Sequence, residues 1–62
     1  MEEYLTTNQL ADRLQVSPAT LRYWRHKRTG PPGVKFGKVV RYSLAEVEAW
    51  LAEQARRDGE RR

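Results

Sequence analysis

Two helix start signals lie so close together in this chain that the first helix must be short and the turn after it tight. Thr6 and Gln9 have the spacing of a capping box, and Ser17 precedes Pro18, a residue favoured in the first helical turn because it needs no amide partner there. Apolar residues at helical spacing place the first helix at about residues 7–14. Two helices joined by so short a turn usually cross steeply, and the first braces the second.

The second helix has a narrow apolar side and a wide polar one. It ends before residues 29–33, Thr-Gly-Pro-Pro-Gly, because two prolines and two glycines do not continue a helix. Inside it only Leu21 and Trp24 form an apolar stripe, and the other positions are small, basic or hydrogen-bonding. A helix of this kind is suited to contact with an anionic surface. We interpret it as the DNA recognition helix of a helix-turn-helix.

Residues 34–42 predict a small β-hairpin. Valine and phenylalanine alternate with lysine before Gly37 and Lys38, and Val40 and Tyr42 continue the alternation after them. Glycine in the first position suits a two-residue hairpin turn. Because an isolated hairpin is marginal in water, we expect its apolar face to lie on the helices. The lysine at its tip and the arginine on its return strand are then expected to point outward, as in a wing.

A third capping box, formed by Ser43 and Glu46, begins a final helix at about residues 44–56. Its apolar residues recur at helical spacing, so one face is expected to be buried. Trp50 and Leu51 are expected to meet four residues of the first two helices: Leu10, Leu14, Leu21 and Trp24. This last helix is therefore expected to supply most of the core.

The 62 residues are expected to form one domain, with a core over about residues 4–56. Residues 57–62 contain no apolar anchor and are expected to fray. The expected fold class is mainly α with a small β-hairpin. Its order is helix, helix, hairpin wing and helix, which is a winged helix-turn-helix.

Positive charge is concentrated in the middle of the chain. Residues 1–17 have a net charge of −2 and residues 42–62 a net charge of −1, whereas residues 18–41 carry seven basic side chains and no acidic one. A solvated surface normally mixes both signs, so this block indicates a binding site for a polyanion. Chance clustering of charge is the alternative that composition leaves open.

Several function classes find no support in the composition. The chain has no cysteine and one histidine, so neither a disulfide framework nor a thiolate metal site is expected. No nucleophile–base pair, metal cluster or phosphate-cradling loop is apparent, and we expect neither enzyme activity, a cofactor nor a small-molecule ligand. No apolar run approaches a membrane span, and the N-terminus is acidic. We therefore expect a cytoplasmic protein without a membrane partner.

Two segments resemble one family. Residues 20–24, Thr-Leu-Arg-Tyr-Trp, are similar to the T-(I/L)-R-Y-(Y/W) segment of MerR-type recognition helices, and residues 41–43, Arg-Tyr-Ser, are similar to the R-Y-S that follows the wing there. With the apolar positions around them, the resemblance to excisionase-like and MerR-like winged-helix DNA-binding domains covers about residues 4–52. The resemblance implies DNA contacts by three residues: Arg22, Tyr23 and Arg41.

The chain departs from MerR-like regulators in two places. Those regulators continue into a long dimerisation helix, whereas this chain stops soon after Trp50 and Leu51. Its linker at residues 29–32, Thr-Gly-Pro-Pro, also differs from the G-x-L-P common there, so we expect a different loop shape. The size is similar to that of stand-alone phage and plasmid excisionases and other minimal regulators of mobile elements.

The candidate DNA contacts fall into three groups. The first turn of the second helix is expected to face base edges through Ser17, Pro18, Ala19 and Thr20. The rest of that helix offers cations and hydrogen-bonding groups for phosphates and guanines: Arg22, Tyr23, Arg25, His26, Lys27 and Arg28. The wing offers three cations: Lys35, Lys38 and Arg41.

Alternative roles remain open for several of these residues. Thr20 either faces the bases or bonds within its own helical turn, and Tyr23 either reaches a phosphate or is buried in the core. Lys35 and Lys38 either reach the minor groove or backbone, or serve only to prevent strand pairing. The cations of the helix either contact DNA or form a solvated face, and His26 is weak evidence on its own.

We therefore expect a sequence-specific protein that binds double-stranded DNA without catalysis. It would act as an excisionase-type recombination directionality or architectural factor, or as a small transcriptional regulator of a mobile element. One such module covers few base pairs, so copies are expected to bind DNA cooperatively or beside an integrase or other recombinase. The alternative is a protein-interaction module, such as an antitoxin-like or assembly adaptor, whose binding would be insensitive to salt.

Overall fold

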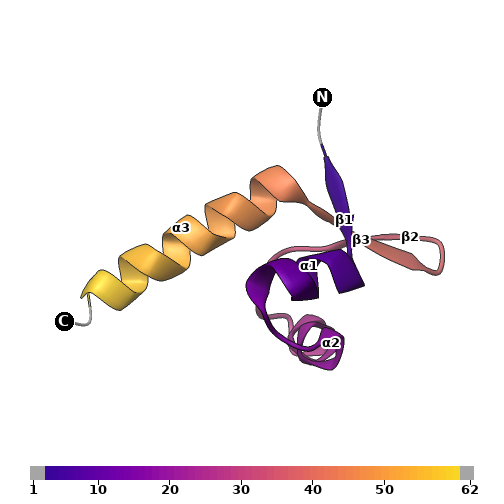
Figure 1. Cartoon of the computed structure of the whole chain (residues 1–62), viewed down its shortest axis with the longest axis horizontal. Helices are drawn as coiled ribbons and strands as arrows, with labels where there is room; N and C mark the ends of the chain where they lie inside the picture. The colour runs from indigo at the N-terminus through magenta and orange to yellow at the C-terminus, as the bar shows by residue number, and fades with distance from the viewer. Residues whose placement is uncertain (1–2, 61–62) are drawn as a thin grey trace.

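A computed structural model describes residues 3–60 and shows three helices with a small antiparallel sheet (Figure 1). The elements in chain order are β1 (Tyr4–Thr6), α1 (Thr7–Leu14), α2 (Pro18–His26), β2 (Val34–Phe36), β3 (Val39–Ser43) and α3 (Leu44–Glu60). The hairpin of β2 and β3 extends from one side of the molecule and α3 from the other, with α1 and α2 between them. This arrangement is a winged helix-turn-helix, as the sequence predicts.

Helix α1 begins and ends where its sequence predicts. The Thr6 amide donates to Gln9 Oε1 at 2.9 Å, and the Gln9 amide donates to Thr6 Oγ1 at 3.0 Å, which completes the capping box. At the other end Gln15 adopts a left-handed conformation with φ 59°, and the amide of Val16 donates to the carbonyl of Ala11 at 3.0 Å. These bonds satisfy terminal backbone groups and turn the chain sharply toward α2.

Helix α2 is capped at both ends. The Thr20 amide donates to Ser17 Oγ at 3.2 Å, and Pro18 occupies the first turn, both as predicted. At the C-terminal end Arg28 is left-handed with φ 57°, and the Thr29 amide donates to the carbonyl of Trp24 at 2.8 Å. This left-handed termination closes the helix just before the predicted break.

The sheet contains a strand that the sequence analysis did not predict. Its order is β1-β3-β2, all antiparallel, with Leu5 opposite Tyr42 and Lys35 opposite Val40. The amide of Leu44 also donates to the carbonyl of Glu3 at 2.8 Å. The hairpin is therefore held by β1 along the edge of β3, and not by the helices alone.

The hairpin divides its apolar residues between its two faces, contrary to the expectation that one apolar face would lie on the helices. Val40 packs against the core, but Val34 and Phe36 are exposed, because the register pairs them with Arg41 and Val39 on the opposite face of the sheet. Lys38 at the turn is exposed, as expected. Arg41 was expected to point outward and is instead half-buried, with Nη1 donating to the carbonyl of Val40 at 2.8 Å.

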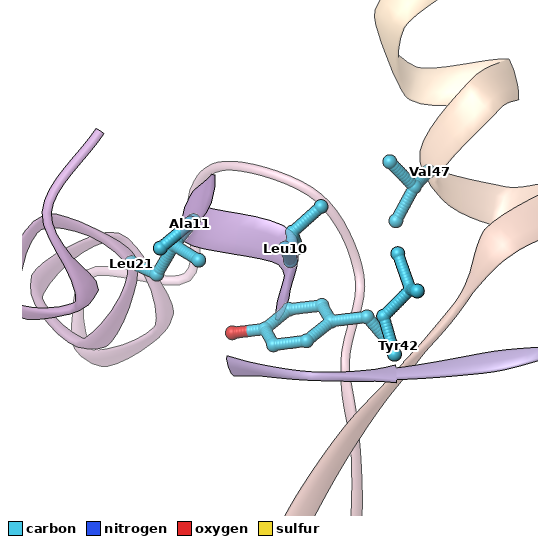
Figure 2. Close-up of a cluster of buried hydrophobic side chains, with 6 residues drawn as sticks. Leu10, Ala11, Leu21, Tyr42 and Val47 are labelled. Carbon is cyan, nitrogen blue, oxygen red and sulfur yellow. The ribbon is translucent and has the colours of Figure 1, made fainter. Parts of the chain in front are cut away.

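The core is centred on Tyr42 (Figure 2). Its ring extends beside Leu10, with its hydroxyl toward the side where Ala11 and Leu21 lie, and Val47 lies near the other end. These side chains and Leu5 form the buried apolar cluster. The close fit continues into the loop, because a Cβ added at Gly33 would lie 2.9 Å from a ring carbon of Tyr42.

Helix α3 contributes less to the core than expected. Val47 is its one buried residue within the described part of the chain, whereas Leu51 is 39% exposed. Trp50 is half-buried, with its ring centroid 6.0 Å from that of Trp24. The prediction that α3 supplies most of the core is wrong, because the helix extends away from the other elements after its first turns (Figure 1).

The same helix runs past its predicted end at residue 56 and continues to Glu60. Glu53 accepts hydrogen bonds from Arg56 and Arg57, and Arg56 also forms an ion pair with Glu60. Such pairs, three and four residues apart, stabilise an exposed helix. They account for helical structure where fraying was expected, and residues 61–62 of the expected tail lie outside the described residues.

Candidate nucleic-acid interface

The first turn of α2 presents small side chains held in place by local bonds. Ser17 Oγ lies 2.9 Å from Thr20 Oγ1, in addition to capping the Thr20 amide. Thr20 was expected either to face the bases or to bond within its own helical turn. The bond within the turn is present, because the Thr20 hydroxyl is engaged by Ser17. Ala19 is exposed beside it, while Pro18 and Thr20 are half-buried. The turn thus offers methyl groups and the Ser17 side chain to a partner.

The remaining exposed positions of α2 form a cationic face. Tyr23 is 59% exposed, so the alternative that it is buried in the core is wrong. Lys27 Nζ lies 5.9 Å from the centroid of the Tyr23 ring, within the range of a cation–π contact. The exposed candidate residues of this segment are Arg22, Tyr23, Arg25, His26, Lys27 and Arg28.

A groove lies between α2 and the wing. We define the basic groove by the residues that line it: Thr6, Thr7, Asn8, Arg22, Arg25, His26, Lys38, Val39, Val40, Arg41 and Tyr42. Four of the predicted cations therefore come together from two separate elements, and no acidic side chain among residues 3–60 lines the groove. An open surface of this composition is suited to a chain of phosphates.

Residues 4–55 match the family model of the helix-turn-helix domain. The chain belongs to this family. No curated protein and no solved structure gives a significant match. Family membership supports DNA as the partner of this helix-turn-helix domain. The structure has the helix-turn-helix that the family match implies, formed by α1 and α2.

Three candidate cations of the helix-turn-helix domain lie outside the basic groove. Arg28 lines a second hollow with Arg25 and the loop at residues 29–33, while Lys27 lies against Tyr23. Lys35 is exposed on β2, the outer strand of the wing. Because Arg25 lines both hollows, the hollow that contains Arg28 adjoins the basic groove.

Three residues at the start of α1 line the groove although the sequence did not predict them as contacts: Thr6, Thr7 and Asn8. Thr6 was recognised only as a helix cap. Its place in the groove follows from the pairing of Thr6 with Arg41, which brings the start of α1 beside the wing. No local pattern in the sequence indicates a pairing between strands so far apart along the chain.

Burial and charge both act on Tyr42, which lies between the core and the groove. Burial raises the pKa of its hydroxyl above the ordinary value, and the nearby Arg25 guanidinium opposes that shift.

The arginines of α3 differ from those of the groove because they form ion pairs. Arg56 and Arg57 both pair with Glu53. Residues 18–41 contain no acidic side chain that could neutralise the groove in this way.

Two negative findings concern residues 3–60 alone. No group of His, Asp or Glu side chains in this range is arranged to hold a metal ion. None of the helices there has the length and apolar character needed to cross a membrane.

Proposed function

We propose that this protein binds double-stranded DNA in a sequence-specific manner, with α2 in the major groove and the wing over the flanking backbone. The observation that carries the proposal is the basic groove, in which Arg22 and Arg25 of α2 converge with Lys38 and Arg41 of the wing. Membership of the helix-turn-helix family supports it. Cations from two elements that converge on one groove suit a phosphate backbone that passes between them.

Base recognition is assigned to the start of α2. Ala19 and the methyl group of Thr20 suit apolar contact with thymine, because the Thr20 hydroxyl is engaged by Ser17. Arg22 and Arg25 follow on the exposed side, where a guanidinium can bond a guanine edge in bidentate fashion or bind a phosphate. The exposed Tyr23 hydroxyl is assigned a phosphate contact.

The cations around the groove are assigned to the backbone. Lys27 and Arg28 follow the last residue of α2, and three cations belong to the wing: Lys35, Lys38 and Arg41. Each phosphate contact adds affinity without sequence information, so these residues set the register of the protein on the duplex. His26 lines the groove and is assigned a backbone contact on the same grounds.

The biological role that we propose is an excisionase-type recombination directionality or architectural factor, or a small transcriptional regulator of a mobile element. The excisionase-like and MerR-like resemblance of residues 20–24 and 41–43 supports this choice. A single module reads few base pairs, so the proposal includes cooperative copies on DNA or a recombinase bound beside them. It places the protein in the cytoplasm, where its DNA target lies, and involves no catalysis, cofactor or small-molecule ligand.

The test begins with selection of bound sequences from a pool of random duplexes, followed by measurement of Kd for variants. Arg22→Ala and Arg41→Ala are each expected to raise Kd about tenfold or more, since good charged contacts to DNA are worth about 1–3 kcal/mol. Arg13→Ala is the matched control, because Arg13 is an exposed arginine of α1 that does not line the groove. Circular dichroism establishes that each variant is folded.

Equal Kd values for all three variants would overturn the proposal, because net charge alone would then explain binding. Recovery of no preferred sequence would refute sequence-specific recognition. Binding that is insensitive to salt would favour the protein-interaction alternative, since phosphate contacts release counterions and impose a steep dependence on salt.

A further inference from the structure

The outer strand of the wing, β2, has one edge that pairs with no strand among residues 3–60. The sheet order β1-β3-β2 places β2 (Val34–Phe36) at one margin, where it pairs with β3 on one side. All three of its residues are exposed. The backbone groups along such an edge form a template for a further strand. The sheet can therefore be extended at β2.

The two faces of β2 differ in chemistry. Val34 and Phe36 lie on one face and Lys35 lies on the other, because successive side chains of a strand alternate. The register adds Val39 to the first face, since it lies opposite Phe36. A further strand beside β2 would therefore meet apolar side chains on one face of the sheet and a lysine on the other.

The apolar face of β2 continues across the sheet as an exposed surface. We define the wing patch as Tyr4, Val34, Phe36 and Val39, whose exposed fractions are 44%, 42%, 54% and 44%. The rings of Tyr4 and Phe36 meet edge to face, with centroids 6.1 Å apart and an interplanar angle of 89°, a favoured geometry of aromatic pairs. Four large exposed apolar side chains on so small a sheet indicate a contact surface.

Strand β2 lies at the border of the surface assigned to DNA and not within it. Within the described part of the chain, the basic groove is lined by residues 6–8, by α2 and by residues 38–42, and by no residue of β2. Val39 is shared by the groove and the wing patch, so the two surfaces adjoin along β3. The hairpin projects from the rest of the molecule (Figure 1). A segment paired with the outer edge of β2 therefore leaves the basic groove open.

The charge of the wing limits which strand can pair with β2. Lys35 and Lys38 are exposed, and residues 18–41 contain no acidic side chain. A second copy paired symmetrically through the same strand would set Lys35 opposite the same lysine, and like charges directly opposite each other destabilise a sheet. A lysine on an edge strand discourages neutral and basic strands in the same way. A strand with a carboxylate at the position opposite Lys35 is favoured instead.

We propose that β2 binds an extended acidic segment of a different protein as a fourth strand of the three-stranded sheet. The apolar side chains of that segment cover the wing patch, and its carboxylates lie beside Lys35. Main-chain hydrogen bonds supply affinity in strand addition, and alternate side chains supply specificity. The recognised sequence is therefore an alternation of apolar residues with Asp or Glu. Strand addition does not depend on the proposed function, whereas its occurrence on DNA does.

The experiment measures the Kd of a fluorescein-labelled peptide, Val-Glu-Ile-Glu-Val-Glu, by fluorescence anisotropy. Two control peptides separate pattern from charge. One has the same residues in blocks, Val-Val-Ile-Glu-Glu-Glu, and the other is the basic peptide Val-Lys-Ile-Lys-Val-Lys. The alternating acidic peptide is expected to bind about tenfold more tightly than either, because it alone places carboxylates beside Lys35 and apolar side chains on the wing patch at once.

Variants of the wing place the contact. Phe36→Ser should raise the Kd of the alternating acidic peptide about tenfold, because apolar contact is lost, whereas Phe36→Leu should retain most of the affinity. Lys35→Glu should raise the Kd of the acidic peptide and lower that of the basic peptide, each about threefold or more. A merely structural effect would not produce this reversal. Arg13→Glu is the matched control, because Arg13 is an exposed residue of α1, outside the wing, and the change in net charge is the same.

Methylation of the peptide amides tests the main-chain pairing. Alternate residues of an added strand direct their amides to opposite edges, and one edge alone meets β2. Methylation of one alternate set of amides should therefore abolish binding, and methylation of the other set should leave Kd unchanged. Equal effects of the two sets would show that the peptide does not bind as a strand.

The failures of the two proposals are distinguishable. If the native protein binds the peptide and no duplex, the proposed function fails and strand addition stands. A ternary complex with peptide and duplex is the expected result, and release of the peptide by a duplex would place it in the basic groove and overturn the assignment. Equal Kd values for the alternating and blocked peptides would overturn it as well, since net charge alone would then explain binding. Self-association that Phe36→Ser abolishes, measured by sedimentation, would assign the wing patch to a second copy instead.

Discussion

Gly33 is a position at which one added methyl group should damage this protein by overpacking alone. A Cβ there would lie 2.9 Å from one ring carbon of Tyr42 and 3.3 Å from two other ring atoms, whereas ordinary contacts lie at 3.4–4 Å. Tyr42 is 2% exposed and is enclosed by Leu10, Leu21 and Val47, so its ring has little room to move away. Overpacking of this kind costs about 1–3 kcal/mol.

That cost is a large share of the total stability. A core in a chain of this size rarely supplies more than about 3–5 kcal/mol. Since each kcal/mol shifts the melting temperature of a small domain by about 4–8 °C, Gly33→Ala should lower Tm by roughly 5–20 °C. Thermal unfolding followed by circular dichroism measures the shift.

Two other glycines provide controls for the same substitution. A Cβ at Gly37 or Gly59 would meet nothing within 4 Å. Gly37→Ala should cost about 1 kcal/mol, because φ is +64° there and alanine avoids that region. Gly59→Ala should leave Tm unchanged or raise it slightly, because alanine favours a helix. A Tm for Gly33→Ala at or above that of the native protein would refute the reasoning, since the Tyr42 ring would then have space to yield.

Two further predictions follow from Arg28 and from Tyr42. Arg28→Gly should leave Tm unchanged or raise it, because glycine adopts φ 57° without strain. The same substitution should weaken DNA binding and reduce the slope of log Kd against log salt by about 0.9. Unchanged binding would remove Arg28 from the interface. Because burial raises the pKa of Tyr42, the stability that its neutral form contributes is kept below about pH 10 and is lost as pH rises through the folded pKa. Urea unfolding over a pH series should show this loss above pH 10 in the native protein and a smaller one in Tyr42→Phe; identical profiles would contradict the assignment.

Local features of the fold could be predicted from the sequence because they depend on neighbours a few residues apart. The side chains of Thr6 and Ser17 cap the two helices at the predicted positions, and Gly37 forms the predicted turn. At the predicted start of α3, the Glu46 amide donates to Ser43 Oγ at 3.4 Å. In each case the determining contacts lie within one turn of helix or strand.

The features that sequence reasoning missed depend on pairing between distant segments. Strand β1 has three residues, Tyr4–Thr6, too few for an alternating pattern to stand out. Helical spacing identified an apolar face on α3, but not how far the other elements cover it, so Leu51 was placed in the core although it is exposed. The cations of the candidate site were predicted as a group because they are adjacent in the sequence, whereas Thr7 and Asn8 reach the groove only through the pairing of β1 with β3.

The pairing of β1 with β3 also has a consequence for the order in which the chain folds. Contacts between α1 and α2 are local and require little loss of chain entropy, so they can form early. The pairing of Thr6 with Arg41 instead closes a loop that contains both helices, and its entropic cost is repaid only when the core around Tyr42 is complete. The wing is therefore expected to gain the support of β1 late in folding and to lose it early in unfolding. The support of the wing therefore depends on how firmly β1 stays paired with β3.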